Sequence, residues 1–247
     1  MPSFIFRFFN TLKRSSFLQI QPELIRIFIG YDSREPIAYH VCVQSIMETS
    51  SFPLSITPLR LSNLKYIFDR KRETNQFTDF SYTRFLVPYL CQYQGWAIFI
   101  DGDMLIREDI SKLWMLQNND YAVMVVKHPE FSGSHTFMNN TATIFPKFNW
   151  SSVMLFNNSK CRALMPDYLK TVDYQELHQF KWLLDEKELG SLPNEWNHLV
   201  NYYPPNSNAA LVHWTLGGPY LGGKLETAEF ADEWYTMRTK ALHIQET

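Results

Sequence analysis

Short apolar runs that alternate with helical segments constrain the fold of this chain most strongly. The runs AIFI, YAVMVV and VMLF are almost wholly apolar, and polar or helical stretches separate them. Continuous apolar character is typical of strands covered on both faces, whereas a strand with one solvated face alternates apolar and polar residues. We therefore expect an α/β fold with a mixed, mostly parallel sheet and helices on both faces.

The regular pattern begins at residue 24 and continues to the end of the 247 residues without a linker or an internal repeat. We expect residues 24–247 to form one catalytic domain, preceded by an extension, residues 1–23. The extension mixes phenylalanines with basic residues, and two interpretations remain open. It is either a basic amphipathic anchor that lies on an anionic membrane surface, or a segment packed on the domain.

Charge and cysteine content exclude several classes of protein. The net charge is −2, from 23 basic and 25 acidic residues, so no basic field favours a nucleic-acid partner. The three cysteines are far apart and lie in apolar segments, which predicts reduced core thiols rather than disulfides. No run approaches the roughly 18 apolar residues that a membrane span requires. We expect a cytoplasmic protein, at most peripheral at the inner membrane face.

Two aspartates, Asp101 and Asp103, directly follow the apolar run AIFI. Ligands of open α/β sheets bind beyond the carboxyl ends of the strands, and residues two apart in an extended chain point to the same side. Two neighbouring carboxylates repel each other unless a cation or a proton lies between them, and their oxygens suit Mn²⁺ or Mg²⁺. The pair therefore predicts a metal site for a diphosphate, although Asp-Gly-Asp is also ordinary turn chemistry.

Two enzyme classes place such a motif after an apolar strand. In phosphotransferases of the haloacid-dehalogenase type, the first aspartate is a nucleophile on the first strand, and an acidic pair follows late in the domain. Here the motif comes late, and the segment LVHWTLGG stands in place of an acidic pair. A metal-dependent glycosyltransferase is the leading interpretation, the phosphotransferase is the second, and a non-catalytic nucleotide-sugar-binding protein is the third.

Several further segments resemble glycosyltransferase family 8, in the order that the family has them. They are SYTRFLVPYL before the apolar strand, DGD, DISKLW, FNWSSVMLFNNSKCR, LPNEWN and ALVHWTLGGPY, and the resemblance covers residues 25–220. It implies a Rossmann-like fold of the GT-A type and a bacterial enzyme that transfers a sugar from a nucleotide diphosphate donor. Retention of the anomeric configuration is also implied.

The resemblance assigns the metal site to three residues. Asp101 and Asp103 would coordinate Mn²⁺ or Mg²⁺, with Asp103 the more direct ligand of the diphosphate-bound ion, and His213 would be the third ligand. From the sequence alone, His213 could equally be a histidine of the core. Arg84 would pair with the donor phosphate or bridge to the aspartates, since the helix face on which it lies is otherwise apolar.

Two glycine-containing turns are expected to hold the nucleotide. Gly30, Tyr31 and Asp32 match a base-binding turn, where a ring can stack on uracil and a carboxylate can accept an N–H of the base. Tyr31 could instead cover the edge of the sheet. Gly217 and Gly218 would allow the backbone to approach phosphate oxygens closely.

The sequence also departs from the family pattern. Where the family often has Asp-Gln, this chain has His178 and Gln179, so Gln179 would lie near the anomeric carbon while sugar recognition would differ. The expected partners are a UDP-sugar donor and a glycan or glycolipid acceptor. The acceptor is expected over the loop 129–149 and the late tryptophans Trp150, Trp182 and Trp196, although the composition of the surrounding segments favours a place in the core for each tryptophan at least as much.

Overall fold

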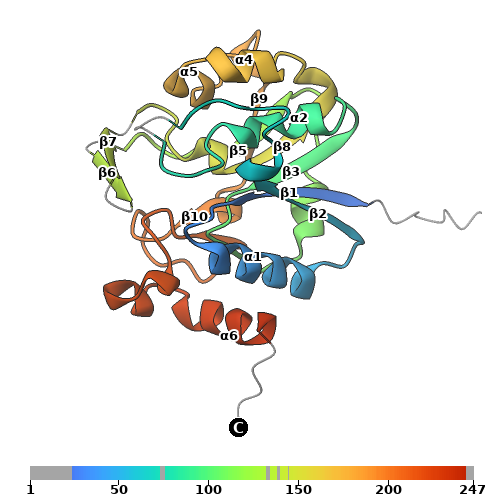
Figure 1. Ribbon diagram of the computed structural model, residues 1–247. Coiled ribbons are helices and arrows are strands. Elements are labelled where there is room, and N and C mark those ends of the chain that lie inside the picture. Colours follow the sequence, from blue (N-terminus) through green and yellow to red (C-terminus); the bar gives the residue numbers. More distant parts are fainter. Residues whose placement is uncertain (1–23, 73–75, 132–133, 138–139, 144, 243–247) are drawn as a thin grey trace, which may run out of the picture.

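The computed structural model describes residues 24–72, 76–131, 134–137, 140–143 and 145–242 (Figure 1). The expected extension, residues 1–23, lies outside the described residues, so both interpretations of it stay open. Within the described ranges, no helix combines the length and the apolar character needed to cross a bilayer.

A six-stranded mixed sheet forms the centre of the protein, in the order β2-β1-β3-β8-β5-β9. Strand β8 is antiparallel to both of its neighbours, whereas the other pairings are parallel. The predicted fold class is therefore confirmed. The strands are β1 (Ile25–Tyr31), β2 (Leu54–Arg60), β3 (Trp96–Ile100), β5 (Val123–Val126), β8 (Val153–Asn157) and β9 (Leu189–Leu192).

Two smaller sheets accompany the central one. Strands β10 (His198–Leu199), β11 (Leu211–His213) and β4 (Met104–Ile106) form a three-stranded sheet, with β11 in the middle. Strands β6 (Ser134–Phe137) and β7 (Asn140–Thr143) form a hairpin within the region expected to be a loop. The three-stranded sheet matters for function because it returns the late part of the chain to the end of β3.

Helices cover the central sheet on both faces (Figure 1). Helices α2 (Val87–Leu90), α4 (Pro166–Thr171) and α5 (Tyr174–His178) lie on one side, and α1 (Pro36–Thr49) lies on the other, with α6 (Ala231–Ala241) packed outside it. The N-cap of helix α3 (Ile110–Trp114) is Asp109, whose side chain accepts a hydrogen bond from the Ser111 N–H at 2.9 Å. The segment DISKLW offers Asp109 and Ser111 as N-caps, and Asp109 is the one that the structure uses.

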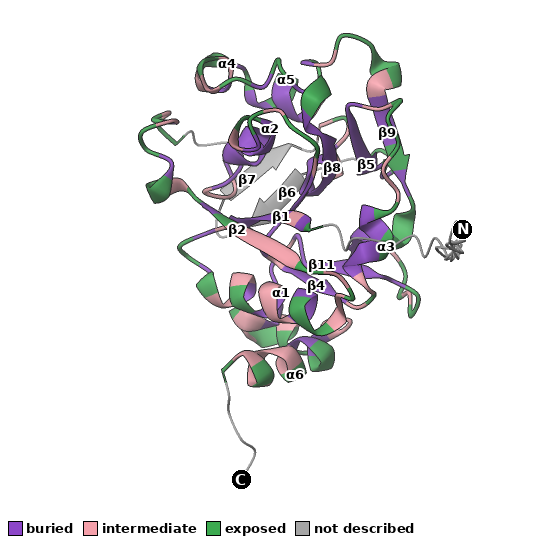
Figure 2. Cartoon of the chain, turned by 90° about the vertical axis from the view of Figure 1, so that its right-hand side faces the viewer, coloured by how far each residue is buried: buried purple, intermediate pink, exposed green. Residues whose placement is uncertain are grey.

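Burial follows the apolar pattern of the sequence. Strands β5 and β8 are buried throughout, whereas β2 is largely half-buried (Figure 2). Strand β2 is an edge strand, as its Pro58 predicts, since proline cannot donate to a ladder. The three cysteines are free and buried, as expected. Burial raises the pKa of the Cys42 thiol, which keeps it protonated.

Two helices differ from the expectation. The spacing of apolar residues in SYTRFLVPYLCQYQ predicts one helix kinked at Pro88, and this prediction is wrong. A 3₁₀ turn, Thr83–Leu86, is followed by α2, and Pro88 lies in the first turn of α2, where its missing N–H costs nothing. The segment ELHQFKWLLDE predicts a helix through residues 176–186, and this prediction is also wrong. Helix α5 ends at His178, and Phe180 has φ +60°, which a helix cannot accommodate.

Candidate active site

Strand pairing brings Asp101, Asp103 and His213 together. Asp101 follows the last residue of β3, and Asp103 precedes the first residue of β4. Strand β11 runs antiparallel to β4 with His213 opposite Met104, and the Trp214 N–H donates to the Asp103 carbonyl at 3.3 Å. Residues from opposite ends of the domain therefore meet where β3 ends.

The glycine between the aspartates is required by close packing. A Cβ atom on Gly102 would lie 2.3 Å from the carbonyl oxygen of Gly30, at the end of β1. Non-bonded contacts of a Cβ atom are essentially never this short. The atom that it would meet belongs to the backbone, which cannot move aside as the end of a flexible side chain can. The aspartate motif therefore lies directly against the turn that was expected to bind the nucleotide base.

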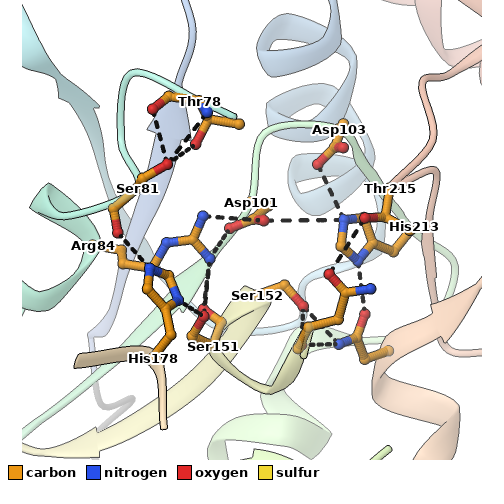
Figure 3. A network of polar contacts seen from close by, with 12 residues as sticks. Thr78, Ser81, Arg84, Asp101, Asp103, Ser151, Ser152, His178, His213 and Thr215 are labelled. Carbon is orange, nitrogen blue, oxygen red and sulfur yellow. Dashed lines mark hydrogen bonds and ion pairs between the residues drawn. The ribbon is translucent and has the colours of Figure 1, made fainter. Parts of the chain in front are cut away.

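The three side chains are arranged as a metal site would require (Figure 3). One ligand atom from each of Asp101, Asp103 and His213 lies within 4.8 Å of the others. His213 Nε2 is 3.4 Å from Asp103 Oδ1 and 4.0 Å from Asp101 Oδ2. Asp103 Oδ1 is buried and accepts no hydrogen bond from the described residues. An uncompensated carboxylate oxygen at this point fits a cation, and this donor set could hold a divalent metal ion.

The hydrogen bond behind His213 fixes which of its nitrogens faces the aspartates. Nδ1 lies 3.1 Å from Asn197 Oδ1, which can only accept, so Nδ1 carries the hydrogen. The Asn197 orientation is set independently, because its Nδ2 faces Ser152 Oγ at 2.8 Å and His128 Nε2 at 2.9 Å. The Nε2 atom is therefore the ring nitrogen that faces the two carboxylates, which is the orientation that a metal ligand needs.

Asn197 is a functional candidate to which the sequence reasoning assigned no role. It is fully buried and ends the segment LPNEWN, which was matched to the family as a motif. Its contact with His213 depends on the pairing of β10 with β11, which the sequence does not reveal.

Replacing Asn197 with alanine should weaken Mn²⁺ binding by about 10- to 100-fold, because His213 loses the hydrogen bond that orients its ring. Isothermal titration calorimetry with Mn²⁺ alone measures this. Asn194→Ala is the matched control, since Asn194 is exposed in the same turn. Equal affinities for the Asn197 variant and the unchanged protein would show that this hydrogen bond does not orient a metal ligand.

Arg84 contacts Asp101 rather than open solvent. Its Nη1 lies 3.0 Å from Asp101 Oδ1, and Nη1 also donates to the Ser151 carbonyl at 2.9 Å. Of the two expected roles, the observed contact is the bridge to an aspartate. Burial raises the pKa of Asp101 to about 7, Arg84 opposes this rise, and the neighbouring Asp103 adds to it. Binding of a dication would favour the charged carboxylate and displace its proton.

The turn after β1 is occupied by contacts within the protein. Burial alone would raise the pKa of Asp32, but hydrogen bonds from the Arg34 side chain and backbone outweigh it and lower the pKa. The Arg34 guanidinium donates to both Asp32 oxygens, at 2.9 and 2.6 Å. Tyr31 packs edge-on against Tyr39, and a Cβ on Gly30 would meet the Phe80 ring at 2.5 Å. Base binding by Gly30, Tyr31 and Asp32 stays a prediction.

Of the ten predicted site residues, six are not among the described residues that line the cavity beside the aspartates, and Gly30, Tyr31 and Asp32 are three of these six. Gly217, Gly218 and Gln179 are not among the described residues that line it, whereas His178 is. Gly217 has φ +101°, so glycine is required there by the turn itself. The Gln179 carbonyl accepts a hydrogen bond from Lys147 at 3.2 Å. The nucleotide-sugar and catalytic roles of these three residues stay predictions.

Polar and aromatic side chains together form the cavity wall. Hydroxyl and amide groups and aromatic rings both contribute to it. The lining residues other than the four charged or metal-site residues are Phe77, Thr78, Ser81, Phe145, Phe148, Asn149, Ser151, Tyr174, His178 and Thr215. Such a wall can bind a polyhydroxylated ring through hydrogen bonds and stacking, next to a site for a charged diphosphate.

The comparison with protein families identifies the class of enzyme. Residues 40–218 match the sequence model of Glycosyl transferase family 8, and the chain belongs to this family. It is therefore an enzyme that transfers sugars. The haloacid-dehalogenase alternative is not favoured.

Known proteins extend this result. The chain is 42% identical over 219 residues to Protein CDI of Arabidopsis thaliana, across 85% of this chain and 84% of that protein. The bacterial source that the resemblance implied stays a prediction, since this relative is from a plant.

Solved structures of glycosyltransferases share the fold. The bifunctional enzyme WbbM has a TM-score of 0.61 at 14% identity, covering 92% of this chain and 53% of its own. GlyE of Streptococcus pneumoniae has a TM-score of 0.58 at 12% identity, covering 89% of this chain and 63% of its own. The galactosyltransferase LgtC, solved with donor and acceptor sugar analogues, has a TM-score of 0.55 at 10% identity, covering 90% and 98%. The chain thus spans about half of WbbM and nearly all of LgtC.

Proposed function

We propose that the protein transfers a sugar from a UDP-sugar to a glycan or glycolipid acceptor with retention of configuration, using Mn²⁺ or Mg²⁺ held by Asp101, Asp103 and His213. The observation that carries the proposal is the convergence of the orphaned Asp103 oxygen, the Asp101 carboxylate and His213 Nε2, with Nε2 3.4 Å from Asp103 Oδ1. Two carboxylates and an imidazole nitrogen that converge on one point form a donor set that suits a divalent cation.

Each residue of the site would have a separate role in sugar transfer. A bound dication would neutralise the charge that develops on the leaving diphosphate. Asp101, Asp103 and His213 would hold this dication, and Arg84 would keep Asp101 ionised and in place. The aromatic wall of Phe145 and Tyr174 would limit access of water to the anomeric carbon and so favour transfer over hydrolysis. Gln179 is kept as the proposed residue near that carbon.

The structure leaves one of the three late tryptophans as a candidate for contact with the acceptor. Trp182 and Trp196 are buried, so their expected place at the acceptor was wrong and they belong to the core. Trp150 is half-buried and donates through Nε1 to the His128 carbonyl at 2.9 Å. The acceptor is proposed to bind over the loop 129–149, and a cytoplasmic location with membrane contact through residues 1–23 remains part of the proposal.

Donor hydrolysis tests the proposal. The protein is incubated with a panel of nucleotide sugars with and without Mn²⁺, and the released nucleoside diphosphate is measured. We expect metal-dependent release of UDP from one UDP-sugar. Turnover of simple phosphate esters instead would reject sugar transfer. If nothing turns over but UDP raises the melting temperature only with Mn²⁺, the protein binds nucleotide sugars without catalysis.

A further inference from the structure

A buried chain of hydrogen bonds leads from Ser81 to Asp101 (Figure 3). His178 Nε2 lies 3.1 Å from the Ser81 carbonyl, so Nε2 carries the hydrogen and Nδ1 has the lone pair. Nδ1 therefore accepts the hydrogen of Ser151 Oγ at 2.7 Å. With its hydrogen committed, Ser151 Oγ turns a lone pair toward Arg84 Nη1 at 3.4 Å, and Arg84 pairs with Asp101. With a neutral His178, the donor and the acceptor of each of these hydrogen bonds are therefore determined.

His178 cannot itself act on a ligand, because both of its nitrogens are committed. Its side chain is 4% exposed, and its ring packs against Tyr174 at 4.3 Å and Phe85 at 5.2 Å between centroids. Burial, and after it the charge of Arg84, lowers the pKa of His178 well below its ordinary value, so the imidazole is neutral. The ring borders the cavity as a neutral group whose two nitrogens are held by Ser81 and Ser151.

The position of Arg84 depends on this neutral partner. The guanidinium lies near the rings of Phe80 and Phe99, at 5.2 and 5.1 Å, and its terminal nitrogens reach Asp101 on one side and Ser151 on the other. A carboxylate at position 178 would compete with Asp101 for the same cation. The neutral imidazole of His178 accepts the Ser151 hydrogen without attracting the guanidinium, so Arg84 stays paired with Asp101.

We propose that His178 is a positioning residue for sugar transfer, which acts through Ser151 to hold Arg84 against Asp101. The role in transfer rests on the proposed function of the site, whereas the effect on Arg84 does not. His178 stands where the family resemblance led us to expect an aspartate. The proposal explains how a histidine serves there without contacting the donor.

Kinetics of variants test the pathway through Ser151. His178→Leu and Ser151→Ala should each lower kcat of donor turnover by about 10- to 100-fold with a smaller effect on KM, because the alignment of reacting groups is lost. The kcat of the double variant should be no lower than the kcat of the less active single variant, because both substitutions interrupt the same pathway. His178→Asn should restore most of kcat, since its amide oxygen can accept the Ser151 hydrogen. Losses that multiply in the double variant would overturn the proposal.

Nuclear magnetic resonance of the Arg84 guanidinium gives a second readout that needs no donor. In the unchanged protein, the contacts with Asp101 and Ser151 should slow rotation and give separate Nη signals for Arg84. Ser151→Ala removes one hydroxyl and is expected to fold, and it should average these signals, as should His178→Leu. His178→Asn should retain them. A protein that turns over no donor but shows this pattern would lack the proposed function and keep the positioning role. Unchanged Arg84 signals in Ser151→Ala would overturn the proposal.

Discussion

Replacing Asp103 with asparagine should lower Mn²⁺-dependent release of nucleoside diphosphate by about 10²- to 10³-fold, the largest loss of activity that we expect. The amide keeps the size of the side chain but removes the charge from the oxygen that faces His213 Nε2 at 3.4 Å. Loss of one anionic ligand weakens the hold on the metal and on the leaving group together. Steady-state assays with and without Mn²⁺ measure the effect.

Asp120→Asn is the matched control for this experiment, because Asp120 is exposed and lies away from the cavity lining. The control should retain full activity. If Asp103→Asn folds normally and releases nucleoside diphosphate at the original metal-dependent rate, Asp103 is not a ligand of the catalytic metal.

Replacing Gly102 with alanine should lower the free energy of unfolding by about 2–3 kcal/mol, the largest loss of stability that we expect. The added Cβ would lie 2.3 Å from the Gly30 carbonyl oxygen, so the end of β1 and the aspartate turn must separate. Because both aspartates flank this residue, Mn²⁺ binding should weaken as well. Chemical denaturation and calorimetry measure the two effects.

Gly223→Ala separates this steric effect from a purely conformational one. Gly223 has φ +63° and nothing within 4 Å of its added Cβ, so alanine there costs only the left-handed conformation, about 1 kcal/mol. Similar losses for both variants would mean that the contact between Gly102 and Gly30 relaxes easily and does not position the aspartates.

The sequence predicted those parts of the fold that depend on local patterns. Apolar runs located the buried strands, and Pro58 marked β2 as an edge strand, because each property follows from neighbouring residues. The length of α5 was not predictable in this way. Its end depends on Phe180, a residue type with no preference for φ +60°, so its conformation is set by tertiary contacts.

The candidate site was predictable only in part for a similar reason. Asp101 and Asp103 stand out because they end an apolar strand, but His213 was identified by family resemblance, since its pairing across β11 and β4 is long-range. Asn197 and Ser151 carry no local signal. Their roles arise from hydrogen bonds to residues distant in the sequence, with Nδ1 of His213 and Nδ1 of His178.

The most direct test of the metal site is anomalous diffraction from crystals grown with Mn²⁺ and UDP. A single manganese peak within coordination distance of Asp101, Asp103 and His213, bridged to the UDP phosphates, is the predicted result. UDP bound in the crystal with no manganese between these three side chains, at a saturating Mn²⁺ concentration, would contradict the account.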